Sequence, residues 1–537
     1  MKSTSFDLII VGAGSAGCVL ANRLSADPSR RVLLIEAGPA DRTFWMRLPV
    51  GYFKSMHDPR RTWQFDVDPQ ESTANRRIVW PRGKVLGGSS AINGLLYIRG
   101  QHQDFDDWAQ AARDPGWSYR SVLPVFRRSE RYQGPHSDYH GTGGELGVSE
   151  LRNDHPACEA WLQAAAQAGH RRITDFNAAE QEGVGPYHLS IGERWRSDTG
   201  SCFLDPVRTR PNLTVMSETQ VLKVTIEQGR AVGVQVLQQG QISTIACDGE
   251  VILCAGALQS PQILQLSGIG SPELLRAHGI GVVHDAPDVG EHLQDHYQAR
   301  VIVRLKKPIS LNNQVRNPIE LARMGLQWAL QGRGPLTVGA GQVGGLAATQ
   351  HAIGGRADIL FNVMPLSVDK PGDPLHRFAG FSASATQCRP LSRGHVRIGS
   401  ADPLAAPRIR ANYLVEDQDA RTLVEGLKML REIVAQPAFA ALSDGSEYMP
   451  GNTLKSDQEL ERFARERGGT VFHPSGTCRM GADDRAVVDA RLRVRGVERL
   501  RVIDASIMPA MVSTNTNAAT IMIGEKGAAL VLEDLQA

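Results

Sequence analysis

Cysteine is scarce in this sequence and is not arranged for pairing. The 537 residues contain seven cysteines, an odd number, and no two of them form a C-x-x-C motif. A disulfide framework normally shows an even set of cysteines at short spacings in a secreted chain. The sequence therefore favours reduced thiols in the cytoplasm.

Long apolar runs are also missing. No run approaches the length of about 18 residues that marks a membrane-spanning helix. The short apolar run near the N-terminus leads directly into glycines and is too short for the apolar region of a signal peptide. We expect a cytoplasmic protein with no transmembrane span, and we leave peripheral attachment to the inner face of the membrane open.

Neither sign of charge dominates. There are 59 Lys and Arg residues against 57 Asp and Glu residues, which gives a net charge of +2. Proteins that bind nucleic acid usually carry a basic patch or stripe, so we expect no nucleic-acid partner. The chain is longer than a single hydrophobic core usually supports, so we expect more than one domain.

The first 36 residues follow the pattern of a βαβ unit. Residues 6–11 read FDLIIV, an apolar run typical of a strand buried on both faces, and a helix is predicted from about residue 16 to 25. Residues 31–36 read RVLLIE and predict a second strand. The motif G-A-G-S-A-G lies between the first strand and the helix, which is where dinucleotide binding requires it.

Each glycine of this motif has its own physical role. Gly12 permits a tight turn, Gly14 lets the backbone approach a pyrophosphate at the helix N-terminus, and Gly17 lets the helix pack closely on the strand. Glu36 ends the second strand, 19 positions after Gly17, where its carboxylate can accept hydrogen bonds from a ribose. An acidic residue there disfavours the 2′-phosphate of NADP.

A second glycine-rich segment favours FAD over NAD. Residues 82–100 read RGKVLGGSSAINGLLYIRG, and their small residues and backbone N–H groups could contact a second phosphate or an isoalloxazine ring. An NAD enzyme has no obvious need for such a segment. The alternative is an ordinary loop in which Ser89 or Ser90 caps a helix.

The rest of the chain alternates predicted helices and strands. Alternating patterns over 298–306 and 379–400 predict an antiparallel sheet, and strands are also expected over 212–227 and 249–256. A helix with Pro261 in its first turn should follow the last of these. Further helices are expected near 104–112, 119–131, 155–168, 417–435 and 517–535.

Five segments together resemble the glucose–methanol–choline (GMC) oxidoreductase family, and within it the bacterial choline-dehydrogenase-like and aliphatic alcohol dehydrogenases. The resemblance covers nearly the whole chain, and the second and third segments are similar to the family's two diagnostic stretches. The segments are VGAGSAG (11–17), GKVLGGSSAIN (83–93), GALQSPQILQLSGIG (256–270), HPSGTCRMG (473–481), and VIDASIMP with NTNAATIMIGEK (502–509 and 515–526).

The resemblance implies an α/β fold with a doubly wound, Rossmann-like FAD-binding domain and an α+β substrate domain built on an antiparallel sheet. Both domains would be assembled from separate stretches of the chain. The FAD-binding domain is expected to comprise residues 1–154, 205–300 and 456–537, the last with the catalytic histidine. The substrate domain is expected to comprise residues 155–204 and 301–455.

The resemblance also implies which residues hold FAD. Glu36 would bind the adenosine ribose, and Val221 would meet the adenine through its backbone. Some members attach FAD covalently through a histidine immediately before Asn93, but this chain has Ile92 there, which implies non-covalent binding. No metal is expected. The full expected cofactor set is Gly12, Gly14, Ser15, Gly17, Glu36, Ala37, Arg82, Gly87, Gly88, Ser90, Asn93, Gly94, Val221, Ala255, Gly256, Asp504, Ala505, Asn517, Ala518 and Thr520.

His473 begins the HPSGTCRMG stretch and matches the family's catalytic histidine. Histidine suits the removal of a hydroxyl proton because its pKa, about 6.5, lies near working pH. Taken alone, a histidine before Pro474 would more often be a hydrogen-bonded loop residue. The other histidines, including His292 and His296, are expected to be structural.

The family's second polar residue is histidine or asparagine, and the resemblance puts it at Asn517. An amide can donate a hydrogen bond to an alkoxide but cannot act as a base. The same residue could instead cap the final helix, a position that asparagine favours.

The predicted activity is oxidation of an alcohol, expected to be primary, to the aldehyde by hydride transfer to flavin N5. The expected partners are a small-molecule alcohol and an electron acceptor: a quinone, a dye-like acceptor or oxygen. The alternatives are a redox-neutral flavin-containing lyase of the same family, an oxidase that uses oxygen, an NAD-dependent dehydrogenase and a non-catalytic nucleotide-binding protein. The sequence does not identify the alcohol.

Overall fold

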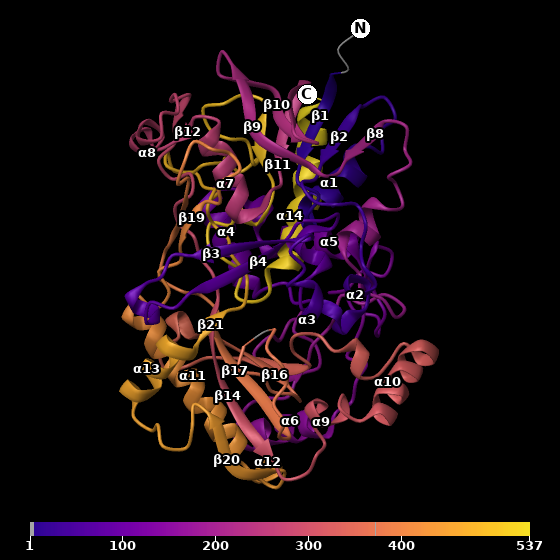
Figure 1. Cartoon of the computed structure of the whole chain (residues 1–537), viewed down its shortest axis with the longest axis vertical. Helices are drawn as coiled ribbons and strands as arrows, with labels where there is room; N and C mark the ends of the chain where they lie inside the picture. The colour runs from indigo at the N-terminus through magenta and orange to yellow at the C-terminus, as the bar shows by residue number, and fades with distance from the viewer. Residues whose placement is uncertain (1–4, 371, 537) are drawn as a thin grey trace.

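Two large sheets organise the computed structural model, which describes residues 5–370 and 372–536 (Figure 1). The first sheet has the strand order β8-β2-β1-β11-β10-β9, with β22 paired to β11. Its strands are β1 (Phe6–Val11), β2 (Val32–Ile35), β8 (Leu213–Met216), β9 (Thr219–Glu227), β10 (Arg230–Gln238), β11 (Gln241–Leu253) and β22 (Leu500–Val502).

The second sheet has the order β20-β14-β17-β16-β15-β7, with β21 paired to β14. Its strands are β7 (Gly183–Pro186), β14 (Tyr297–Leu305), β15 (Val343–Ala347), β16 (Ile359–Met364), β17 (Gly380–Gln387), β20 (Ser443–Met449) and β21 (Gly469–Thr470).

The centre of the first sheet is parallel. β1 pairs in parallel with β2 and β11, β2 with β8, and β11 with β22. Every residue of β2 and the last four of β1 are buried, as expected of strands covered on both faces. Helix α1 (Ser15–Leu24) packs against α14 (Thr516–Asp534), so the two ends of the chain meet beside this sheet, as the indigo and yellow elements of Figure 1 show.

The strands of the second sheet run antiparallel to their neighbours. Helices α6 (Pro156–Gln167), α11 (Asp417–Ala435) and α13 (Asp457–Arg467) pack beside it. Tyr297, Ala299 and Val301 of β14 belong to the core on the helix side. The alternate residues Gln298 and Arg300 line a pocket on the other face.

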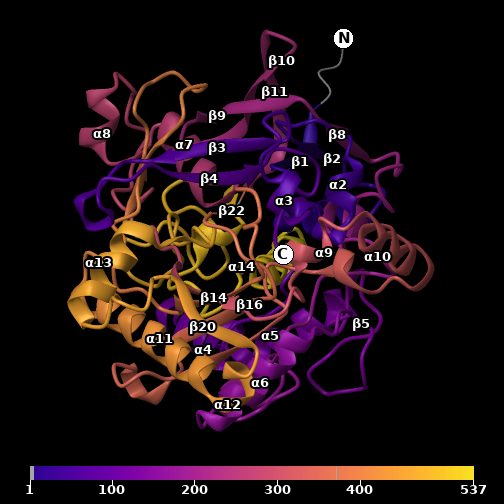
Figure 2. The same cartoon turned by 60° about the horizontal axis from the view of Figure 1, so that its bottom comes forward.

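A two-stranded ribbon lies between the two sheets. It consists of β3 (Thr62–Val67) and β4 (Ile78–Gly83), which pair in antiparallel fashion. Figures 1 and 2 both place this ribbon between β9 of the first sheet and β14 of the second. The end of β4 leads directly into the second glycine-rich segment, so the ribbon delivers that segment to the space between the sheets.

The architecture and most of the predicted elements are confirmed. The helix expected near 104–112 is α4 (His102–Ala112), and that near 119–131 is α5 (Tyr119–Ser129). All seven cysteines are unpaired. Among the described residues, no helix is both long enough and apolar enough to cross a membrane.

The predicted position of Pro261 is wrong. Helix α7 spans Gly256–Leu266 and holds Pro261 in its interior rather than in its first turn. Proline has no N–H, so the carbonyl oxygen of Ala257 loses its helical partner. The hydroxyl of Thr477 donates to that oxygen at 2.7 Å, and this tertiary contact replaces the missing bond.

Among the three glycines of the G-A-G-S-A-G motif, Gly17 is the one where a side chain should be least tolerated. A Cβ there would lie 1.9 Å from the carbonyl oxygen of Gly12. Gly17→Ala should therefore lower the free energy of unfolding by about 1–3 kcal/mol, the usual cost of overpacking, although alanine favours helix.

Gly325→Ala provides the matched control. Gly325 lies within α10 (Pro318–Gln331), and a Cβ there would meet no atom within 4 Å. Thermal unfolding of the two variants measures the difference. A Gly17→Ala protein as stable as the unsubstituted chain would contradict the packing of α1 on β1.

Candidate active site

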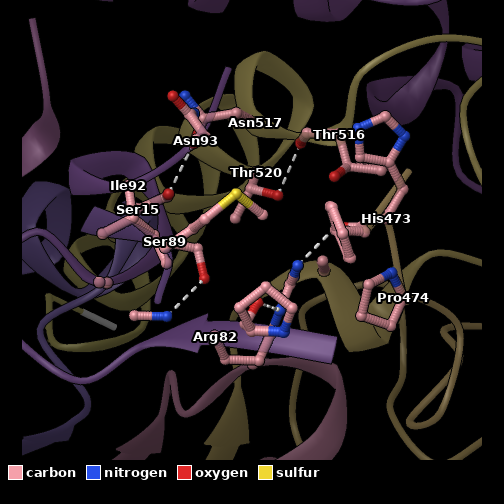
Figure 3. A pocket seen from close by; sticks show the side chains of 18 of the residues that line it. Ser15, Arg82, Ser89, Ile92, Asn93, His473, Pro474, Thr516, Asn517 and Thr520 are labelled. Atoms are coloured by element: carbon pink, nitrogen blue, oxygen red, sulfur yellow. Dashed lines mark hydrogen bonds between the residues drawn. The ribbon is translucent and has the colours of Figure 1, made fainter. Parts of the chain in front are cut away.

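One pocket lies between the two sheets and is lined by both. The turns that follow β1 and β2 line one end, and side chains of β14, β16 and β17 line the other. Residues 470–474 and the start of α14 also face the pocket. Figure 3 shows the part of the pocket where the second glycine-rich segment, His473 and the start of α14 meet.

Glu36 follows β2 and is buried, with 6% of its surface exposed. Its Oε2 accepts a hydrogen bond from the N–H of Ala13 at 3.0 Å, and its Oε1 accepts one from the N–H of Gly38 at 2.9 Å. Burial raises the pKa of Glu36 to about 7, and these N–H groups oppose the rise. Each oxygen keeps a second lone pair, so the carboxylate can still accept from hydroxyl groups in the pocket.

The two glycine-rich segments touch through their backbones. The N–H of Gly87 donates to the carbonyl oxygen of Ala13 at 2.8 Å. A Cβ on Gly88 would lie 2.6 Å from the Cα of Gly14, so only glycine permits this approach. Ser89 follows and lines the pocket (Figure 3).

Asp504 ties the C-terminal segment to the pocket. Its Oδ2 accepts from the N–H of Gly256 at 2.8 Å and from the hydroxyl of Ser260 at 2.6 Å. Its Oδ1 accepts from the N–H of Ser506 at 2.8 Å. Burial raises the pKa of Asp504, and these donors oppose the rise. The carboxylate therefore holds the start of α7 against the turn after β22, where Ala505 lines the pocket.

Most of the residues expected to hold the cofactor line this pocket, and a few lie behind its wall. Ser90 donates to the carbonyl oxygen of Gly87 at 2.6 Å, and neither residue lines the pocket. Gly17 packs α1 against Gly12, and Ala518 belongs to the core. The residues that do line the pocket are Gly12, Gly14, Ser15, Glu36, Ala37, Arg82, Gly88, Asn93, Gly94, Val221, Ala255, Gly256, Asp504, Ala505, Asn517 and Thr520.

This lining fits an FAD molecule. Ser15 begins α1 at the pocket wall, where the first N–H groups of a helix have no partner within the helix and attract phosphate. The glycines leave room for a pyrophosphate, and Glu36 offers an acceptor to a ribose. Ile92 also lines the pocket and presents only hydrocarbon at the position where some GMC proteins have a linking histidine.

The loop that carries His473 is fixed by its backbone. The N–H of His473 donates to Oδ1 of Asp295 at 2.6 Å, and the other carboxylate oxygen accepts from the hydroxyl of Thr470 at 2.6 Å. Arg82 donates to the carbonyl oxygen of Phe472 at 2.8 Å (Figure 3). Phe472 has a φ of 67°, an uncommon conformation for a bulky residue that these contacts hold in place.

The ring of His473 is held by a second histidine. Nδ1 of His473 lies 2.9 Å from Nδ1 of His296, and Nε2 of His296 lies 2.8 Å from the carbonyl oxygen of Cys388. A carbonyl can only accept, so Nε2 of His296 carries the hydrogen and its Nδ1 accepts when the ring is neutral. Nδ1 of His473 then donates, and Nε2 of His473 keeps its lone pair.

The surroundings keep both rings neutral. Burial lowers the pKa of His296 to about 4. Burial also lowers the pKa of His473 well below its ordinary value, and the nearby His296 and Arg82 add to that effect. Near pH 7 both histidines are therefore in the state that the hydrogen-bond assignment requires.

The amide that reaches His473 belongs to Asn515. Nδ2 of Asn515 lies 3.2 Å from Nε2 of His473. Oδ1 of Asn517 instead accepts from the hydroxyl of Ser15 at 2.7 Å, away from His473 (Figure 3). The expected pairing of His473 with Asn517 is corrected accordingly. Asn515 is the N-cap of α14 and Asn517 lies two positions further, and side chains two positions apart on a helix do not share a face.

The sequence did not reveal several residues that line the pocket or contact its lining. Asn515 is the first asparagine of the N-T-N motif. Which of the two asparagines faces His473 depends on the residue at which α14 begins, and the sequence alone does not fix that residue. His296 was visible in GEHLQDH, although nothing in that motif shows what its ring contacts. Ser89 lies in the second glycine-rich segment but was considered only as a possible helix cap, and Arg300 lines the pocket without any signal in the sequence that marks it.

The GMC oxidoreductase family matches this chain over residues 6–298 with its N-terminal region and over residues 390–524 with its C-terminal region. The chain is 40% identical to an alcohol dehydrogenase (acceptor) of Pseudomonas putida, over 98% of this chain and 96% of that protein. It is also 40% identical to an oxygen-dependent choline dehydrogenase of Escherichia coli, over 98% of this chain and 94% of that protein. The chain belongs to the GMC oxidoreductase family, and the resemblance seen in the sequence is confirmed.

Solved structures agree with this assignment. Pyridoxine 4-oxidase from Mesorbium loti matches with a TM-score of 0.87 and 31% identity, over 98% of this chain and 99% of that chain. A formate oxidase variant from Aspergillus oryzae, solved to study FAD modification, matches with a TM-score of 0.91 and 25% identity, over 100% of this chain and 99% of that chain. The predicted fold class is therefore confirmed.

Glu36→Gln tests whether this carboxylate contributes to cofactor binding. The amide keeps the size of the side chain but turns an NH₂ group toward one of the two backbone N–H groups that donate hydrogen bonds to Glu36. The FAD dissociation constant should rise by about 10–100-fold, which corresponds to losing a hydrogen bond to a charged group. Fluorescence titration of the apoprotein with FAD measures the change.

Glu218→Gln serves as the control for Glu36→Gln. The side chain of Glu218 is 69% exposed, so the same chemical change there should leave FAD affinity unaltered. Equal affinity in both variants would exclude Glu36 from the cofactor site.

Proposed function

We propose that this protein is an FAD-dependent oxidoreductase that oxidises an alcohol, with His473 as the base. The observation that carries the proposal is the Nε2 atom of His473, which keeps its lone pair in a pocket whose opposite end suits a dinucleotide. Membership of the GMC family supports FAD as the cofactor. The relatives named as alcohol and choline dehydrogenases support a CH–OH donor as substrate.

Bound FAD would supply an acceptor for the hydride that leaves the carbinol carbon. His473 would take the hydroxyl proton at Nε2, while its Nδ1–H remains hydrogen-bonded to His296. Asn515 would donate to the substrate oxygen as negative charge develops there. Arg82 lies near His473, and its positive charge would favour the negative charge that develops on the substrate oxygen. Asn517, which contacts Ser15, would act on the cofactor side instead.

We further propose that the first sheet with its helices binds the cofactor and that the second sheet covers the substrate. The segment boundaries expected from the sequence stay a prediction. The electron acceptor is a separate question, and the names of the relatives include both dehydrogenases and oxidases. Measuring oxygen uptake beside dye reduction with one alcohol distinguishes the two.

The flavin should be bound without a covalent link, because the linking position holds Ile92. Acid precipitation of the purified protein should leave the yellow colour in the supernatant and a colourless washed pellet. Flavin fluorescence that stays with the polypeptide on a denaturing gel would refute non-covalent binding.

His473→Ala should slow flavin reduction by roughly 10²–10⁴, the usual contribution of general acid–base catalysis. Asn515→Ala should slow it by about 10²–10³, the cost of one donor to developing charge. Asn517→Ala is the control, since it should weaken FAD binding more than it slows reduction. Anaerobic stopped-flow mixing of FAD-saturated variants with a reactive alcohol measures each rate. Near-normal reduction by folded, FAD-loaded His473→Ala would exclude His473 as the base.

The pH dependence follows from the same assignment. Only the neutral ring accepts a proton, and the pKa of His473 is lowered. The rate of flavin reduction should therefore stay level as pH falls through the ordinary histidine value, about 6.5, and decline only below it. A rate that already declines above that value would contradict a buried, neutral base.

A further inference from the structure

A row of polar side chains crosses the sheet face at the substrate end of the pocket. In the register of the second sheet, Arg300 of β14 lies opposite Ser384 of β17, and Ser384 lies opposite Asn362 of β16. All three residues line the pocket. Directly opposed residues on neighbouring strands have their Cβ atoms about 4.5–5.5 Å apart, so one ligand group can contact more than one of them. The row presents a guanidinium, a hydroxyl and an amide to the pocket.

Arg300 has no protein partner among the residues that the structure describes. It makes no side-chain hydrogen bond and no ion pair within 4.0 Å there, in contrast to Arg82, which donates to backbone carbonyls. The carboxylate that acts on it electrostatically, that of Asp369, accepts instead from the hydroxyl of Tyr448 at 3.3 Å. A partly enclosed guanidinium without a partner is costly, and an anionic ligand would remove that cost.

The carboxylates that line the pocket belong to the cofactor end. They are Glu36, which accepts from the N–H groups of Ala13 and Gly38, and Asp504, which accepts from Gly256 and Ser260. Neither is directed at the second sheet. A cationic substrate at Arg300 would therefore meet charge of its own sign without a compensating carboxylate from the described lining.

We propose that the substrate is an alcohol that carries a carboxylate, and that Arg300, Ser384 and Asn362 bind this carboxylate. This inference rests on the proposed alcohol oxidation and names its substrate class. Arginine matches a carboxylate through two parallel N–H donors, and the hydroxyl and the amide can donate to the remaining lone pairs. A single guanidinium with two neutral neighbours suits a monoanion better than a phosphate dianion.

The position of the row also sets the length of the substrate. His296, which holds His473, immediately precedes β14, and Arg300 lies four residues further along, a Cα separation of about 13 Å in extended backbone. This spacing favours a substrate whose hydroxyl, at His473, and carboxylate, at Arg300, are separated by several bonds. ω-Hydroxy acids and hydroxymethyl-substituted aromatic acids have such a separation.

A preference for carboxylate substrates would distinguish this chain from the relatives named as choline dehydrogenases. Three alcohols of one shape form the test: 6-hydroxyhexanoate, its neutral amide, and the alcohol with trimethylammonium in place of the carboxylate. An aromatic series with 4-(hydroxymethyl)benzoate and its amide repeats the comparison. The holoenzyme should show a kcat/KM for the carboxylates about 10–100-fold above that for the amides, which is the usual worth of a charge-assisted hydrogen bond. The trimethylammonium alcohol should be the poorest of the set.

Substitution of Arg300 should reverse these preferences. Arg300→Met should bring carboxylate and amide to similar kcat/KM values, chiefly through KM. Arg300→Glu should favour the trimethylammonium alcohol. Arg304→Met is the matched control, because Arg304 lies on the same strand but is exposed and packs over Phe378, 4.4 Å from its ring centroid. That variant should keep the preference for carboxylates.

A binding measurement keeps the test independent of turnover. Hexanoate and 4-methylbenzoate cannot be oxidised at a hydroxyl, and each should perturb the flavin spectrum of the holoenzyme at lower concentration than its amide. This difference should vanish in Arg300→Met. If neutral alcohols reduce the flavin but carboxylates gain nothing over amides, the substrate class is wrong and the proposed function stands. If no alcohol reduces the flavin, the proposed function fails, and the carboxylate titration still decides whether Arg300 binds an anion.

Discussion

The hydrogen bond between the Nδ1 atoms of His296 and His473 joins the parts of the molecule that the site depends on. His296 immediately precedes β14 of the second sheet, and His473 belongs to the segment that continues into β22 of the first. The bond exists only if one ring donates and the other accepts. Protonation of His296 at Nδ1 would place two donors face to face, so the low pKa that burial imposes on that ring preserves the contact.

The charges around the pocket are divided between its two ends. At the cofactor end, carboxylates are satisfied by backbone N–H groups, as with Glu36 and Asp504. Near His473 and on the face of the second sheet, the described lining contributes Arg82 and Arg300. Because charges act more strongly where water is excluded, this division favours negative charge on the substrate both at the reacting oxygen and at its far end. One electrostatic arrangement thus connects the proposed base with the proposed substrate class.

The two ends of the pocket also differ in how freely the residues that line them can be substituted. The cofactor end depends on backbone contacts, such as that of Gly88 with Gly14, which a Cβ would prevent. The substrate end is a sheet face, where side chains can change without moving the strands. Proteins named for choline, pyridoxine and formate share similarity with this chain, so resemblance alone does not carry substrate identity from one to another.

The sequence by itself determined the βαβ start, the position of the glycine motif, the family and the candidate base His473. These features are local: a strand, a turn and a helix within 36 residues are specified by apolar periodicity and by glycines that a Cβ would exclude. Tertiary structure decided which asparagine of N-T-N faces His473, because that depends on where α14 begins. It also decided the partner of His473 and the position of Arg300 opposite Ser384 and Asn362, since strand register brings together residues that no sequence spacing relates.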